Sequence, residues 1–311
     1  MVLAILARKT EGQTASESDW QRLFATEPYV RLKKREARLK RDFTDDDFKT
    51  FVLSPDLVAR AEAFHHTLAD WKKADLTASA LRVLTYLPGQ ARIHAKVFPV
   101  IKPKTNSFVF ETQSDPTIFL YLDPHESAAK FENTVAHELH HIGFSSVASL
   151  VEAKLKDLSP SVKSAVEWMG AFGEGFAMLA AAGGPDVHPH AVSSPEERAR
   201  WDHDMASFNQ DLATVQQFFL DIISQKLKTK DEIDKKASSF FGVQGPWYTV
   251  GYKMAVIIEK RYGRATLIDC MIDPCELLAR YNSAATELNH IQKDQLALWS
   301  LELLTKIGVS R

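Results

Sequence analysis

The sequence predicts a mainly α-helical protein with a small β-sheet, an α+β fold. Three observations support this. Apolar residues recur with helical spacing over residues 16–87, short strand-like runs fill residues 92–123, and helical patterns continue from residue 124 almost to the end. We therefore expect an N-terminal helical region at residues 1–90 and a larger domain at residues 91–311.

The first third of the chain contains several predicted helices with recognisable starts. Residues 19–41 form a helical stretch that carries the charge run RLKKREARLKR, which we interpret as a solvated helix face. Thr44 caps the next helix, and Ser54 caps a third whose first position is Pro55, where a missing N–H is tolerated. A fourth helix is expected within residues 75–87.

The predicted sheet comprises three short strands within residues 92–123, in the segments ARIHAKVFPVI, SFVFET and TIFLYLD. A helix over residues 127–144 follows, and then a helical C-terminal lobe. In that lobe, Ser-Pro pairs at 159–160 and 194–195 indicate helix starts, and the glycine pair at 183–184 indicates a helix end. We expect TIFLYL to be an edge strand beside the 127–144 helix, where an extended peptide could pair with it.

Composition restricts the classes of partner. Hydrophobic residues make up 45% and charged residues 25%, as in ordinary globular proteins, and the formal charge of −2 gives no reason to expect nucleic acid or an anionic membrane. No apolar run is long enough to span a membrane. The apolar segment at residues 1–7 lacks the preceding charges of an export signal, which favours a cytoplasmic location. With two cysteines, neither a disulfide framework nor a thiolate metal cluster is expected.

The segment HELHH, residues 137–141, lies within the predicted 127–144 helix. His137 and His141 are four residues apart and therefore share a helix face, so both imidazoles can bind one zinc ion. Glu138 lies on the same side of the helix, where a carboxylate can act as general base toward a water at the metal. We expect His140 to point away from this face, as a surface residue or a support for the ligands. A His137/His140 pair stays open, as does the interpretation that these are ordinary histidines of an amphipathic helix.

A catalytic zinc ion needs a third protein ligand, and Glu174 is the best candidate. It lies between Gly173 and Gly175 in a predicted helix, and small residues there would let this helix approach the metal helix closely. An interhelical salt bridge is the alternative role for Glu174. Other candidate ligands are weaker; we interpret the histidines among them as surface residues. They are Glu152, Glu167, His188, His190, Asp202, His203 and Asp204.

Three segments, in this order, resemble those of gluzincin peptidases, particularly the aminopeptidase N family. HELHH is similar to HExxH, GEGFA at 173–177 to NEGFA, and PWYTVGYKMA at 246–255 to the YxKG stretch. The resemblance is closest to bacterial families described as zinc-dependent peptidases, which share HExxH, EG(F/L)A and YxxGYxMA. No GxMEN-type segment precedes HELHH, so the resemblance does not extend to recognition of a free substrate N-terminus.

The resemblance implies a zincin-like catalytic core in residues 91–311 that binds one zinc ion through His137, His141 and Glu174. It also implies that Tyr248 stabilises the oxyanion, with Tyr252 as the alternative; a phenolic O–H is suited to this role. The expected activity is that of a gluzincin-type zinc metallopeptidase acting on a peptide or small protein. Two other functions stay open: hydrolysis of a non-peptide amide or ester, and a catalytically silent, metal-stabilised binding protein.

Overall fold

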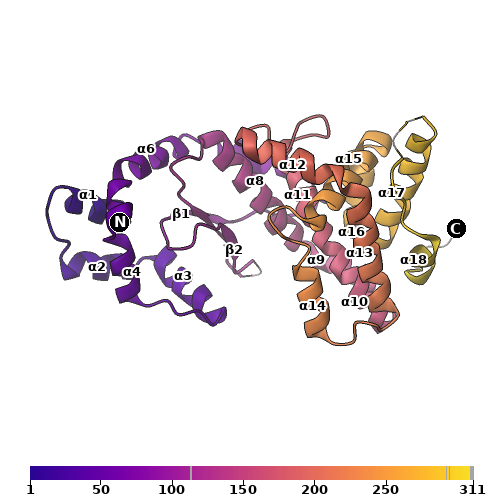
Figure 1. The fold of residues 1–311 in the computed structure, drawn as a ribbon, viewed down its shortest axis with the longest axis horizontal. Coiled ribbons are helices and arrows are strands. Elements are labelled where there is room, and N and C mark those ends of the chain that lie inside the picture. Colours follow the sequence, from indigo (N-terminus) through magenta and orange to yellow (C-terminus); the bar gives the residue numbers. More distant parts are fainter. Residues whose placement is uncertain (113, 292, 294, 309–311) are drawn as a thin grey trace. The chain divides into compact units, whose positions relative to one another are not determined.

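The computed structural model describes residues 1–112, 114–291, 293 and 295–308. The chain divides into two compact units. Unit 1 comprises residues 1–76 and 94–138, and unit 2 comprises residues 77–93 and 139–311. The described residues are mostly helical and include one three-stranded sheet (Figure 1), which confirms the predicted mainly α fold with a small sheet.

Unit 1 contains a helical N-terminal part followed by the sheet. Its helices before the sheet are α1 (Val2–Thr10), α2 (Glu17–Phe24), α3 (Glu27–Arg38), α4 (Asp45–Val52), α5 (Pro55–Ala59) and α6 (Ala61–Trp71). Thr44 caps α4 and Pro55 begins α5, as predicted. The stretch at 19–41 is two helices because Thr26 precedes α3 as N-cap and Pro28 lies in its first turn, where proline favours a new start.

The sheet has the strand order β1 (Lys96–Val100), β3 (Thr117–Tyr121), β2 (Phe108–Phe110). β3 pairs in parallel with β1 and antiparallel with β2. The prediction that TIFLYL is an edge strand is therefore wrong. All five residues of β3 are buried, which suits a central strand with neighbours on both sides.

The outer edge of β1 carries a proline. The Lys96 N–H donates to the Pro116 carbonyl at 3.0 Å and the Leu122 N–H donates to the Val100 carbonyl at 2.9 Å. Residues 96, 98 and 100 thus direct their backbone groups toward β3, and Pro99, which is exposed, lies at a position facing away. Proline is tolerated there because no ladder bond is lost.

Helix α3 covers the sheet with apolar and charged side chains together. Leu32 packs into one cluster with Phe108, Phe110 and Phe119, and the Arg35 guanidinium lies 3.5 Å from the centre of the Phe108 ring. The charge run is therefore only partly the solvated face we predicted. Its arginines cover the aromatic rings of β2 with their apolar stems and planar head groups.

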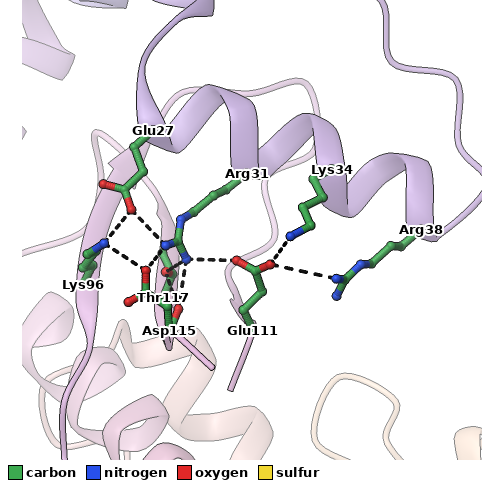
Figure 2. Close-up of polar contacts among 8 residues, drawn as sticks. All are labelled: Glu27, Arg31, Lys34, Arg38, Lys96, Glu111, Asp115 and Thr117. Carbon is green, nitrogen blue, oxygen red and sulfur yellow. Dashed lines mark hydrogen bonds and ion pairs between the residues drawn. The ribbon is translucent and has the colours of Figure 1, made fainter. Parts of the chain in front are cut away.

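Arg31 of α3 is the centre of an ion-pair network with the sheet (Figure 2). Its guanidinium lies 3.0 Å from the Glu111 carboxylate, donates to Thr117 Oγ1 at 2.7 Å and also pairs with Asp115. Lys34 also pairs with Glu111. The network connects α3 to the segment between β2 and β3.

Helix α8 (Ala128–Ser145) is continuous, and the boundary between the two units falls between Glu138 and Leu139 within it. The apolar residues of the helix are buried toward both of its ends, with Phe131 3% and Ile142 2% exposed. Ser127 begins the helix, since its Oγ accepts the Lys130 N–H at 3.2 Å.

Unit 2 contains the remaining helices. Most of α7 (Leu76–Leu84) belongs to it, together with α9 (Ala148–Leu155), α10 (Pro160–Met169), the short helix η1 (Gly170–Phe172), α11 (Gly173–Ala182), α12 (Pro195–Ala206), α13 (Phe208–Ile223), α14 (Lys230–Ser238), α15 (Pro246–Tyr262), α16 (Arg264–Ile272), α17 (Pro274–Asn289) and α18 (Leu301–Lys306). Both predicted Ser-Pro starts are observed, and Gly183 ends α11 with φ of +89°.

An aromatic core joins α13, α15 and η1 within unit 2. Trp247 is fully buried, and its ring centre lies 5.4 Å from that of Phe172 and 6.1 Å from that of Phe219. Burying rings of this size contributes strongly to stability, so the start of α15 is firmly attached to the core of unit 2. In the part of the chain that the structure describes, no helix is long and apolar enough to cross a membrane.

Candidate metal centre

The HELHH segment lies in the middle of α8, as predicted. His137, Glu138 and His141 are partly exposed, whereas His140 is buried with 1% of its surface exposed. His140 does differ in environment from the two predicted ligands, but it is not a surface residue. The side chains expected to do chemistry are thus accessible, and the fourth residue of the motif is enclosed by protein.

Glu174 is the second residue of α11, a helix whose other residues are largely buried. Its carboxylate Oε2 lies 3.3 Å from His141 Nε2, and their side chains are 19% and 28% exposed. His137 is one helical turn before His141. One nitrogen from each histidine and one Glu174 oxygen all lie within 4.8 Å of one another.

These distances fit a metal ion. Ligand atoms about 2.0 to 2.1 Å from a tetrahedral zinc ion lie roughly 3.4 Å from one another. The 3.3 Å separation of His141 Nε2 and Glu174 Oε2 matches this value. Two imidazoles and one carboxylate also leave a fourth position for water, as in catalytic zinc sites. Among the described residues, only this set of histidine, cysteine and acidic side chains is grouped closely enough to hold a metal.

Gly175, next to Glu174, allows close packing of α11 against α15 and not against the metal helix α8. A Cβ on Gly175 would lie 2.0 Å from the Tyr252 backbone nitrogen and 2.6 Å from the Tyr248 carbonyl oxygen, both on α15. A Cβ on Gly251 would lie 2.4 Å from the Phe172 carbonyl oxygen. Gly175 therefore lets α11 touch α15, and Gly251 lets η1 touch α15. The prediction that the glycines beside Glu174 let its helix approach the metal helix is corrected. Gly173 has open space around its Cβ position.

The two tyrosines of α15 have different surroundings. Tyr252 is 8% exposed, its ring lies edge-on to Trp201 with centres 5.2 Å apart, and its hydroxyl donates to the Val187 carbonyl at 3.4 Å. Burial raises the pKa of the Tyr252 phenol to about 12. Tyr248 is partly exposed and lies one turn nearer the start of the helix. The Tyr248 side chain is thus the more accessible of the two.

A contact that the sequence did not reveal joins the start of α15 to α13. Thr249 is fully buried, and its Oγ1 donates to Asp211 Oδ2 of α13 at 2.9 Å. Burial raises the pKa of the Asp211 carboxyl, an effect that the Thr249 hydrogen bond partly opposes. The two residues are 38 positions apart. Thr249 occupies an unspecified position of the YxxGYxMA segment, and Asp211 lies outside the motifs that the sequence shows.

The remaining candidate ligands lie elsewhere. Glu152, Glu167 and His203 are exposed on α9, α10 and α12 respectively. His188 Nε2 bonds to Asp202 Oδ1 at 3.0 Å, while Nδ1 of the same ring accepts the His190 backbone N–H at 3.0 Å. Asp204 is partly exposed on α12 and forms no part of the metal-capable group.

His190 is not the surface residue that we predicted. It is 4% exposed and packs against Trp201, with ring centres 5.4 Å apart. Its Nε2 lies 2.7 Å from the Gln244 amide nitrogen. The imidazole therefore connects the loop before α12 to the loop before α15, a structural role that explains its burial.

Comparison with known proteins identifies one family. The family model described as "Putative zinc dependent peptidase (DUF5700)" matches residues 20–290. No curated protein and no solved structure matches the chain significantly. The matched range includes α8, α11 and α15, which carry the candidate site.

Proposed function

We propose that this chain, which belongs to the family described as "Putative zinc dependent peptidase (DUF5700)", hydrolyses peptide bonds with one zinc ion held by His137, His141 and Glu174. The substrate is a peptide or a small protein. One observation carries the assignment: the ligand atoms of these three residues lie within 4.8 Å of one another. One pair, His141 Nε2 and Glu174 Oε2, is 3.3 Å apart, close to the separation of two ligand atoms on a tetrahedral zinc ion.

Zinc bound here would supply Lewis-acid chemistry, acidifying water and polarising a carbonyl. Glu138 follows His137 on the partly exposed part of α8, and its carboxylate would accept a proton from the attacking water and then pass it to the leaving amine. The Tyr248 phenol would donate a hydrogen bond to the substrate carbonyl oxygen as negative charge develops there. In this proposal each group has one role, and each role suits its side-chain chemistry.

Metal content and turnover of a mixed peptide library, measured on the same preparations, test the proposal. We expect zinc in the wild-type protein and its loss in Glu174→Ala. Glu138→Gln should keep the metal but lower kcat by about 10²- to 10⁴-fold, the usual contribution of a general base. Glu152→Gln, an exposed change on α9, is the matched control and should behave as wild type. Failure of the wild type to bind zinc, or full activity in Glu138→Gln, would contradict the proposal.

A further inference from the structure

The first turn of α15 is held on both sides of Tyr248. Trp247 and Thr249 are each fully buried, whereas Tyr248 between them is partly exposed. The Trp247 indole N–H donates to the Ala237 carbonyl of α14 at 2.9 Å. The Thr249 hydroxyl donates to Asp211 of α13 at 2.9 Å. The backbone that carries Tyr248 is thus attached to two neighbouring helices.

The start of α15 has neither a capping side chain nor an acidic residue of its own. The N-cap of this helix is Gly245, which has no side chain to accept a backbone N–H, and the first turn contains no acidic residue. A carboxylate next to a helix N-terminus offsets the positive end of the helix dipole. Since Asp211 lies on α13 and bonds to Thr249 in the first turn of α15, it can provide this charge from outside the helix.

We propose that Thr249 and Asp211 are positioning residues for Tyr248. Their hydrogen bond fixes the first turn of α15, so that the Tyr248 phenol is directed at the substrate carbonyl before the reaction begins. The proposal rests on the function proposed above, because it gives Tyr248 its role in the oxyanion site. Preorganised donors are effective because they need no rearrangement as charge develops.

Kinetics of a double-mutant cycle test this role. Thr249→Val keeps the shape of the side chain but loses the hydroxyl; it should lower kcat by about tenfold, as small misplacements of catalytic groups do, with KM unchanged. Thr249→Ser keeps the hydroxyl and should restore kcat. Tyr248→Phe removes the phenol that Thr249 is proposed to position. If Thr249 acts only through that group, Thr249→Val should change kcat less than about twofold in a Tyr248→Phe background. An equal loss in both backgrounds, or wild-type activity in Thr249→Val, overturns the proposal.

Changes at Asp211 provide a second route if Thr249→Val does not fold. Asp211→Asn keeps an oxygen that can accept the Thr249 hydroxyl, and Asp211→Ala does not. We expect Asp211→Asn, which keeps the hydrogen bond but loses the charge, to retain more activity than Asp211→Ala, which should show at least the loss expected for Thr249→Val. Equal activity in the two variants overturns the proposal.

A spectroscopic measurement separates this inference from the proposed function. The chain contains 7 tyrosines, so 3-fluorotyrosine labelling gives a small set of fluorine NMR signals, and Tyr248→Phe identifies the one from Tyr248. Thr249→Val should shift or broaden that signal, and Thr249→Ser should not. A wild-type protein without turnover contradicts only the proposed function. An unchanged Tyr248 signal in Thr249→Val contradicts the positioning role.

Discussion

At the scale of single residues, side chains of the same type at the candidate site differ in how far protein encloses them. Tyr248 and Tyr252 are one turn apart on α15, yet only Tyr252 is enclosed, with its hydroxyl bonded to the Val187 carbonyl. Likewise, His140 is buried, whereas His137 and His141 of the same helix are partly exposed. Exposure therefore separates the residues that we propose to meet a substrate from residues enclosed by protein.

Substitution of each tyrosine by phenylalanine tests this difference. Tyr248→Phe removes the proposed oxyanion donor, so kcat should fall by about 10²- to 10³-fold with zinc content unchanged. Tyr252→Phe should keep kcat and lose only about 1 kcal/mol of stability, the net contribution of one hydrogen bond. Steady-state kinetics and urea unfolding measure the two effects. Equal kinetic losses in the two variants would remove Tyr248 from the oxyanion role.

At the scale of elements, the crossing of α11 and α15 brings Glu174 and Tyr248 onto adjoining helices. Figure 1 shows these helices side by side within unit 2. The crossing depends on Gly175, because an added Cβ there would overlap backbone atoms of α15, and Gly251 allows the same close approach between α15 and the preceding short helix η1. Backbone cannot move aside as the end of a flexible side chain can, so the contact is specific for glycine.

Alanine substitutions compare two neighbouring glycines of α11. Gly175→Ala places a methyl group where the Tyr252 backbone nitrogen lies 2.0 Å away, and overpacking of this kind costs about 1 to 3 kcal/mol. Gly173→Ala meets open space and should be neutral or stabilise the helix by up to about 1 kcal/mol. Urea unfolding measures both variants. A Gly175→Ala protein as stable as wild type would show that the helices can separate without loss.

The elements that could be predicted are those with local signals. The starts of α10 and α12 follow from a serine before a proline, and the end of α11 from Gly183. The strand order could not be predicted, because it depends on pairing between distant segments. Arg31 shows the same limit: its partners Glu111 and Asp115 lie 80 and 84 residues away, so a helix pattern alone indicates only a solvated charge.

The residues of the candidate site likewise fall into those with a local sequence signal and those without one. The spacing of His137 and His141 is local, and a helix places them on one face. Glu174 was found through its glycine neighbours and a family resemblance, and the structure brings it within reach of the histidines. The Thr249–Asp211 bond has no local signal, since it depends on how α13 packs against α15. Their roles in catalysis stay predictions.

At the scale of the whole molecule, each unit has its own core, and different interactions join the elements within each unit. Unit 2 uses the aromatic cluster around Trp247. In unit 1 the Arg31 ion-pair network joins α3 to the sheet. Glu111, whose carboxylate pairs with Arg31 and Lys34 in this network, has a backbone φ of +57°. A non-glycine residue in that conformation costs about 1 to 2 kcal/mol, which the ion pairs must offset.

This network predicts a loss of stability in acid. The hydrogen bond from Lys34 lowers the pKa of Glu111 below its usual 4.5, and that from Lys96 lowers the pKa of Asp115 below its usual 3.8. Both carboxyls bind a proton less readily when folded than when unfolded. Their contribution is therefore present above these usual values and is lost as the pH falls through the folded-state pKa values.

Urea midpoints by circular dichroism at pH 7, 5, 4 and 3 measure this effect. The wild type should lose stability below about pH 4.5, where Glu111 begins to bind its proton in the unfolded chain. Glu111→Gln should be less stable at pH 7 and less sensitive to acid. Glu11→Gln, at an exposed position after α1, should keep the wild-type pH dependence. Identical pH profiles for wild type and Glu111→Gln would contradict the prediction.

The proline on β1 interrupts the row of backbone donors on the outer edge of the sheet. A free strand edge with regularly spaced N–H groups is a template onto which a second chain can add, and such growth leads to aggregation. On the outward-facing positions of β1, Val97 offers an N–H and Pro99 offers none. A replacement such as Pro99→Val would restore the missing donor and give that edge the sequence VFVV. Pro99 thus leaves the outward-facing side of β1 with one backbone donor fewer for pairing with another strand.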